Sequence, residues 1–65
     1  MRMEAKGNIS GLDPGLMRFR IGTQWCDYSS AMLDLGNANL ANGLYVEVKS
    51  TSPMANGDMV LDQLR

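Results

Sequence analysis

Residues 7–22 read GNISGLDPGLMRFRIG, and this stretch decides the fold. Apolar and polar residues alternate on both sides of a tight turn signal, the DPG at positions 13–15. Such alternation is typical of strands with one buried face. Proline followed by glycine favours a β-turn, because proline presets φ and glycine tolerates positive φ. The stretch therefore predicts a β-hairpin, with one strand over residues 3–12 and the next over residues 16–21.

The alternation also predicts the faces and the register of this hairpin. A three-residue loop would pair Ile9 with Phe19, which keeps apolar residues on one face, as cross-strand neighbours require. A two-residue loop would need a bulge at Gly11 to reach the same pairing. The predicted register sets Asn8 opposite Arg20 on the outer face. The residues expected to face inward are Met3, Ala5, Gly7, Ile9, Gly11, Met17, Phe19 and Ile21.

A third strand is predicted over residues 24–29, followed by a short one over residues 32–35. Neighbouring residues of a strand point to opposite faces. One of the pairs Trp25/Asp27 and Cys26/Tyr28 must therefore lie outside. The charge of Asp27 favours the Trp25 side as the solvated one.

The segment 36–43, GNANLANG, predicts a single helical turn that begins at Asn37 and ends at Gly43. Residues 45–50 then alternate clearly, with two valines inward and charged residues outward. An Asn-Gly pair at positions 56–57 is a strong hairpin signal. The last strand, residues 58–64, does not alternate cleanly, and we expect a bulge or burial on both of its faces.

These elements predict an all-β fold, a small five- to six-stranded barrel like the oligonucleotide/oligosaccharide-binding (OB) fold, with one short helical turn. Residues 1–65 form one predicted β-barrel domain, either alone or as one repeat of a larger chain. A chain of 65 residues buries only about 60% of its unfolded surface, so the core must be compact.

The composition argues against an enzyme. The chain has no histidine and one cysteine, so it lacks the commonest general base and the usual zinc ligands. Its carboxylates are expected in turns and on outward faces, without the converging pair that acid–base catalysis needs. Cys26 has no basic neighbour, which favours an inert core thiol. We therefore predict no catalytic residue, no cofactor and no metal site.

The chain also lacks sequence signals for a membrane. It has no apolar run of the roughly 18–20 residues that cross a bilayer. Its first residues, MRMEAKG, have no apolar core of a secretory signal.

The motifs resemble a known family. The opening GNISGLD at positions 7–13, the centre LANGLYVEVK at positions 40–49 and the closing ANG at positions 55–57 look like the bacterial domain of unknown function 5666. That family repeats a G-x-I-x-x-L-D opening. This chain departs from it at Ser50, Asn56 and Leu61, where glycine, aspartate and alanine are common. The resemblance implies a small β-barrel carried by exported bacterial proteins, hence a periplasmic or extracellular location, with no catalytic residues.

The predicted function is a non-enzymatic interaction module that binds a protein or a cell-envelope component through its outer face. One alternative is single-stranded nucleic-acid binding, because OB barrels use outward aromatic and basic groups for it. The net charge of −1 argues against this partner. A third alternative is a structural spacer or oligomerisation unit. The predicted binding surface consists of Lys6, Asn8, Arg18, Arg20, Trp25, Tyr45 and Lys49.

Overall fold

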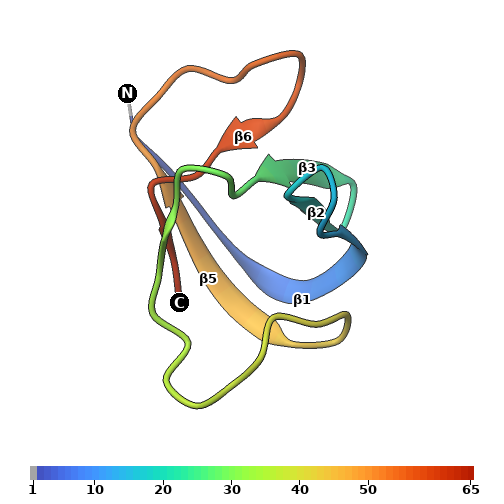
Figure 1. Ribbon diagram of the computed structural model, residues 1–65. Helices are drawn as coiled ribbons and strands as arrows, with labels where there is room; N and C mark the ends of the chain where they lie inside the picture. The colour runs from blue at the N-terminus through green and yellow to red at the C-terminus, as the bar shows by residue number, and fades with distance from the viewer. Residues whose placement is uncertain (1) are drawn as a thin grey trace.

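A computed structural model describes residues 2–65, and these residues form an all-β fold (Figure 1). No helix is present among them. The strands are β1 (Met3–Asp13), β2 (Arg18–Ile21), β3 (Gln24–Asp27), β4 (Met32–Leu33), β5 (Tyr45–Ser50), β6 (Met59–Val60) and β7 (Gln63–Leu64).

All seven strands belong to one coiled sheet in the order β4-β7-β5-β1-β2-β3-β6. The strand pairing does not close this sheet into a barrel, so the predicted five- to six-stranded barrel is wrong, whereas the all-β class is confirmed. The reason lies in the last segment, predicted as one strand. It divides into β6, which pairs with β3, and β7, which lies between β5 and β4.

The division falls at Leu61 and Asp62. The Leu61 N–H donates to the carbonyl of Asp27 on β3, while the Asp62 N–H donates to Lys49 on β5. Leu61 is fully buried. The segment thus runs from β6, at one edge of the sheet, to β7, which lies next to the opposite edge strand. The departure from regular alternation that was expected in this segment is confirmed.

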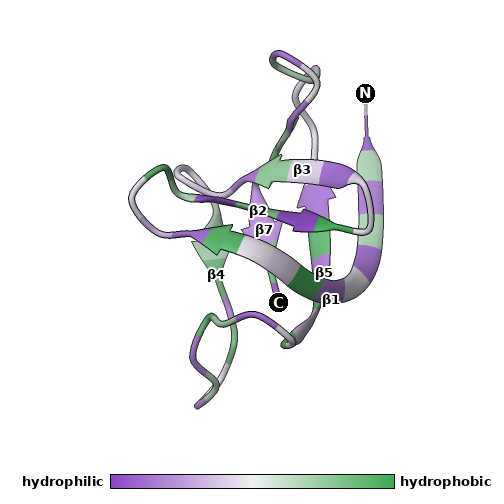
Figure 2. Ribbon diagram, turned by 90° about the vertical axis from the view of Figure 1, so that its right-hand side faces the viewer, coloured by the Kyte–Doolittle hydropathy of each residue, from purple (hydrophilic) through white to green (hydrophobic). Residues whose placement is uncertain are grey.

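β1 is the centre of the fold because it pairs with two strands in succession. Its first half, from Met3 to Asn8, pairs with β5, and its second half pairs with β2. Figure 1 shows β1 and β5 curving side by side, and Figure 2 shows hydrophilic and hydrophobic bands alternating along β1. Gly7 lies where β1 changes partner. A Cβ there would approach Ile21 Cγ2 to 2.6 Å, so glycine permits the close contact.

The core lies inside the curve of this sheet. Nine apolar residues are buried in it, and the inward positions predicted for Phe19, Val46 and Val48 are confirmed. Phe19 stacks on Tyr28 with ring centroids 5.7 Å apart. The buried residues are Ile9, Phe19, Cys26, Tyr28, Val46, Val48, Met59, Leu61 and Leu64.

The predicted register of the first hairpin is wrong by two residues. Ile9 lies opposite Ile21, and Ser10 lies opposite Arg20. The loop is longer than predicted, because Met17 adopts a left-handed φ of 54° and joins the turn instead of the strand. Met17 is consequently exposed, and its carbonyl accepts the N–H of Tyr28.

A bulge compensates for the longer loop. Between Ser10 and Asp13 the register shifts by one residue, and Gly11 has a φ of 59°. Gly11 is therefore exposed, not inward as predicted. The bulge keeps Ile9 and Phe19 on the buried face, which is what the alternation requires.

The predicted helical turn at residues 36–43 is absent. Asparagine and glycine are poor helix formers, because their polar groups compete for backbone partners. Here those partners lie on β1. The Asn42 side chain accepts the N–H of Leu12 at 2.9 Å, and the Gly43 N–H donates to Ile9 at 2.8 Å. The segment covers the edge of β1 beyond the end of β5, and Leu40 packs against the core.

Candidate functional site

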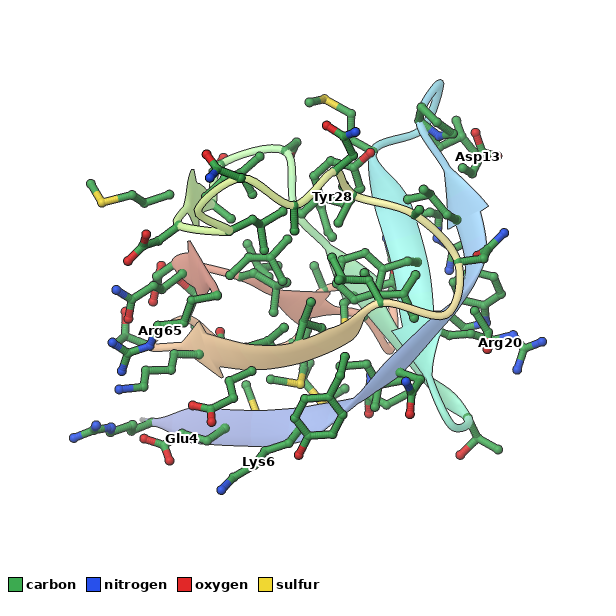
Figure 3. All side chains as sticks on the ribbon, turned by 90° about the horizontal axis from the view of Figure 1, so that it is seen from below. Glu4, Lys6, Asp13, Arg20, Tyr28 and Arg65 are labelled. Carbon is green, nitrogen blue, oxygen red and sulfur yellow. The ribbon has the colours of Figure 1, made fainter. Side chains whose placement is uncertain are left out.

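The seven residues of the predicted surface fall into two groups. Figure 3 shows Lys6 beside Glu4 along β1, with Arg20 well away from both. We call the first group, with its carboxylates, the ladder face: Glu4, Lys6, Asn8, Tyr45, Glu47 and Lys49. We call the second the tryptophan face: Arg18, Arg20, Trp25, Asp27 and Asp58.

The tryptophan face is built on the β2–β3 pairing. Arg20 lies opposite Trp25, and Arg18 lies opposite Asp27. Trp25 is half-buried on the outer face, while Cys26 is buried on the inner one, which confirms the predicted orientation of β3.

Trp25 is held by contacts on several sides. The guanidinium carbon of Arg18 lies 4.0 Å from the centre of the indole, and that of Arg20 lies 6.0 Å from it. The edge of the indole covers Gly11, since a Cβ on Gly11 would approach Trp25 Cη2 to 3.1 Å. The bulge at Gly11 thus makes room for the ring, and cation–π contact fixes its position.

Arg18 is engaged by carboxylates. Its Nη2 atom donates to Asp58 Oδ1 at 3.2 Å, and both side chains are less than one-third exposed. Asp27 lies across from it in the register. Hydrogen bonds from Ser29, with a further contribution from Arg18, hold the pKa of Asp27 below its usual value. The charge of Arg18 is therefore largely neutralised within the protein.

Arg20 differs from Arg18. It is exposed, and its Nη1 atom donates to the carbonyl of Gly22 at 3.1 Å. Within the part of the chain that the structure describes, no carboxylate forms an ion pair with it. Arg20 is thus a cation beside an aromatic ring with donors left for a ligand.

The loop that contains Asp58 is anchored to β3. Ala55 and Asp58 exchange backbone hydrogen bonds of 3.0 Å around a two-residue turn, as the Asn-Gly signal predicted. The Gln24 side chain donates to the carbonyls of Trp25 and Gly57, at 2.8 and 2.9 Å. This loop supports the tryptophan face through Arg18 and Gln24.

The ladder face has another character. Lys6 lies opposite Glu47, Lys49 lies opposite Glu4, and Asn8 lies opposite Tyr45. Each lysine therefore has a carboxylate directly across the strand pair. Tyr45 is 59% exposed. Such a face is typical of a solvated sheet surface that gains modestly from cross-strand pairs.

Asp13, Asp27 and Asp62 accept hydrogen bonds that hold turns and chain segments. Asp13 accepts the N–H of Leu16 at 3.1 Å, and Asp27 accepts both donors of Ser29. Asp62 accepts the N–H and the hydroxyl of Thr51, at 2.5 and 2.6 Å. Each of these carboxylates binds different partners: Asp13 and Asp27 hold local turns, and Asp62 joins its segment to the residue that follows β5.

Cys26 is fully buried in the core. Burial, with a smaller effect from the nearby Asp58 carboxylate, raises the pKa of its thiol to about 11. The thiol is therefore protonated near neutral pH, and a protonated thiol is a poor nucleophile and a poor metal ligand.

Sequence reasoning did not find the supporting residues of the tryptophan face. Gly11 was assigned to the inward side, and neither Gln24 nor Asp58 was included in the predicted binding surface. The sequence carried one usable signal, because a glycine inside a strand marks a bulge or a close approach. The contacts made by Asp58 and Gln24 join β2 and β3 to a loop more than thirty residues later, and no local pattern predicts them.

Within residues 2–65 there is no pocket, no group of three or more metal-binding side chains, and no helix long and apolar enough to cross a membrane. Comparisons with protein-family models, with curated proteins and with solved structures find no match for this chain.

Proposed function

We propose that this chain is a non-enzymatic protein-interaction module and that the tryptophan face is its contact surface. The observation that carries the proposal is the position of Trp25, whose ring has the Arg18 guanidinium carbon 4.0 Å from its centre and whose edge lies over Gly11. Tryptophan and arginine, together with tyrosine, are the residues most enriched among those that contribute strongly to binding energy at protein interfaces.

Preorganisation supports this choice of surface. A side chain that is already fixed loses little conformational entropy on binding, so more of its contact energy appears as affinity. Trp25 is fixed by Arg18, and Arg18 is fixed in turn by Asp58 at 3.2 Å. Tyr45, the exposed aromatic residue of the ladder face, has no comparable contact with an arginine among the described residues.

The chemistry of Arg20 indicates the kind of partner. Its planar guanidinium suits a carboxylate, which it can bind through two parallel hydrogen bonds. The neighbouring indole offers apolar contact beside this charge. The proposed partner is therefore a protein segment that presents an aspartate or glutamate next to an apolar side chain.

Single-stranded nucleic acid is the alternative partner. Arg20 and Trp25 resemble the cation and the stacking platform of such sites. Against it, Arg18 already forms an ion pair with Asp58, and Lys6 and Lys49 lie opposite Glu47 and Glu4 in the strand register, so carboxylates dilute the positive charge of the predicted surface. This alternative predicts binding to oligothymidylate at low salt that weakens steeply as salt rises.

Peptide selection tests the proposal. A random peptide library is selected against the wild-type chain, and binders are then measured on Trp25→Ala, Arg20→Ala and the control Tyr45→Ala. We expect selected peptides to be rich in acidic residues and to lose about tenfold or more in affinity on the first two variants. Binders that depend on Tyr45, or that ignore both Trp25 and Arg20, would overturn the proposal.

The exported bacterial setting and the larger parent chain also belong to this proposal, supported by the family resemblance alone. A spacer or oligomerisation role remains distinct, because it needs self-association. Sedimentation of the isolated chain separates the two: a monomer at high concentration favours recognition of another protein.

A further inference from the structure

We propose that Asn56 is a site of spontaneous deamidation, which proceeds through a cyclic imide formed with Gly57. The chain contains two Asn-Gly pairs, at positions 42–43 and 56–57. The structure gives them opposite environments, so that one pair is protected and the other is open to the reaction. This inference is independent of the function proposed above.

The chemistry needs only the protein and water. The Gly57 backbone nitrogen attacks the side-chain carbonyl carbon of Asn56 and forms a new C–N bond. The bond from that carbon to the amide nitrogen breaks, and ammonia leaves with the proton of the Gly57 amide. Water then opens the imide at either carbonyl and leaves aspartate or isoaspartate at position 56, with one added negative charge.

The Asn56–Gly57 pair is open to this attack. Both residues are exposed and form the tip of a turn held by one isolated bridge, Ala55 to Asp58. Within residues 2–65, no hydrogen bond involves the Asn56 side chain or the Gly57 N–H. Glycine after asparagine leaves the attacking nitrogen unshielded, because it has no side chain.

The Asn42–Gly43 pair is held at both reacting groups. The Asn42 Oδ1 atom accepts the Leu12 N–H at 2.9 Å, and the Gly43 N–H donates to the Ile9 carbonyl at 2.8 Å. The Gly43 carbonyl also accepts the Asn8 side chain. Attack at this pair requires these hydrogen bonds to break first, which only local opening of the β1 edge allows.

Deamidation at Asn56 would reach the tryptophan face. Isoaspartate inserts one carbon atom into the main chain between residues 56 and 57. The Gly57 carbonyl would then shift away from Gln24, and the new charge would lie two residues from Asp58, the partner of Arg18. Since Trp25 is the only tryptophan, its fluorescence reports on this change.

The test is ageing of the wild-type chain at mildly alkaline pH, with peptide mapping by mass spectrometry and isoaspartate detection. We expect Asn56 to deamidate at least about tenfold faster than Asn42, which is detected as the mass increase from loss of ammonia and gain of water. The reaction at Asn42 is slower because the hydrogen bonds at the Asn42 side chain and the Gly43 N–H must break first. The same ageing in concentrated urea should make the two rates similar. Equal rates in the folded protein, or an unequal ratio that persists in urea, would overturn the proposal.

A variant separates the effect of the added charge from that of the inserted atom. Asn56→Asp carries the charge on an unaltered main chain. We expect isolated isoaspartate protein to shift the Trp25 fluorescence and Asn56→Asp to shift it less. Identical spectra for isoaspartate protein and fresh wild type would overturn the link to the tryptophan face.

Discussion

The ladder face and the tryptophan face arise from the same alternating sequence pattern, yet they differ in how their side chains are held. On the ladder face, lysines lie opposite glutamates in the register of β1 and β5, and no ion pair across this strand pair forms among the described residues. On the tryptophan face, a bulge at Gly11 opens room for an indole, and a distant loop supplies Asp58. The neighbouring strand and backbone irregularities, more than outward orientation, therefore determine whether an exposed residue is fixed.

The sharpest difference between the faces should appear when each aromatic residue is removed. Trp25→Ala loses a half-buried ring together with its arginine contacts, and we expect a cost of about 2 kcal/mol. Tyr45→Ala, on the ladder face, should cost less than about 0.5 kcal/mol, as exposed substitutions do. Urea unfolding measures both. Equal costs would contradict the distinction between the faces.

The bulge can be tested with two glycines that have the same positive φ. Gly11 and Gly22 both have a φ of 59°, but a Cβ meets Trp25 and Arg20 only at Gly11, and nothing within 4 Å at Gly22. Gly22→Ala should cost about 1 kcal/mol for the left-handed backbone alone. Gly11→Ala should cost about 2 kcal/mol because the ring must also move.

The difference between these two alanine variants reports on the contacts of the new Cβ with Trp25 and Arg20. It should fall on a Trp25→Ala background and vanish when Arg20→Ala is added. A difference that is unchanged on both backgrounds would assign the cost to the main chain of the bulge and not to these side chains.

The arginine and lysine residues provide a smaller contrast. Arg18→Ala removes both the contact with Trp25 and the ion pair with Asp58, and should cost about 1 kcal/mol. Lys6→Ala removes a solvated cross-strand neighbour and should cost no more than about 0.5 kcal/mol. High salt should reduce the difference between these two stability costs only in part, because the stacking of Arg18 on the indole does not depend on an ion pair. Urea unfolding at low and high salt measures this difference.

The smallest expected effect is a loss of folding stability in acid through protonation of Asp27. The pKa of Asp27 is lowered from the usual aspartate value of 3.8, mainly by hydrogen bonds from Ser29 and to a lesser degree by the charge of Arg18. Because the folded-state pKa is depressed, the stabilisation is present above pH 3.8 and is lost as the pH falls through the folded-state value. The loss should remain below about 1 kcal/mol, since the group is partly solvated.

An NMR titration of the Asp27 carboxyl carbon checks the cause. Ser29→Ala should raise the pKa of Asp27 more than Arg18→Ala does. The reverse order would make the charge of Arg18 the dominant influence.

The sequence predicted the parts of the fold that depend on alternation alone. The strands around residues 3–12 and 45–50 and the outward orientation of Trp25 are confirmed. The register of the first hairpin was wrong, because the left-handed Met17 lengthened the turn. A methionine gives no local signal for that conformation, which glycine and asparagine usually adopt.

The predictions of a closed barrel and of a helical turn were wrong for a different reason. Both depend on tertiary partners: the carbonyls of β3 and β5 that divide the last segment, and the β1 groups that bind Asn42 and Gly43. The predicted surface included the correct outward residues but joined two faces into one. Its division follows from β1, which pairs with β5 along its first half and with β2 along its second.

The most direct test of the recognition proposal is an NMR titration of the ¹⁵N-labelled chain with a selected acidic peptide. We expect shift changes at the Trp25 indole N–H, the Arg20 side chain and the backbone near Gly11, with Lys6 and Tyr45 unaffected. Shift changes confined to Lys6, Tyr45 and their neighbours on β1 and β5 would contradict it.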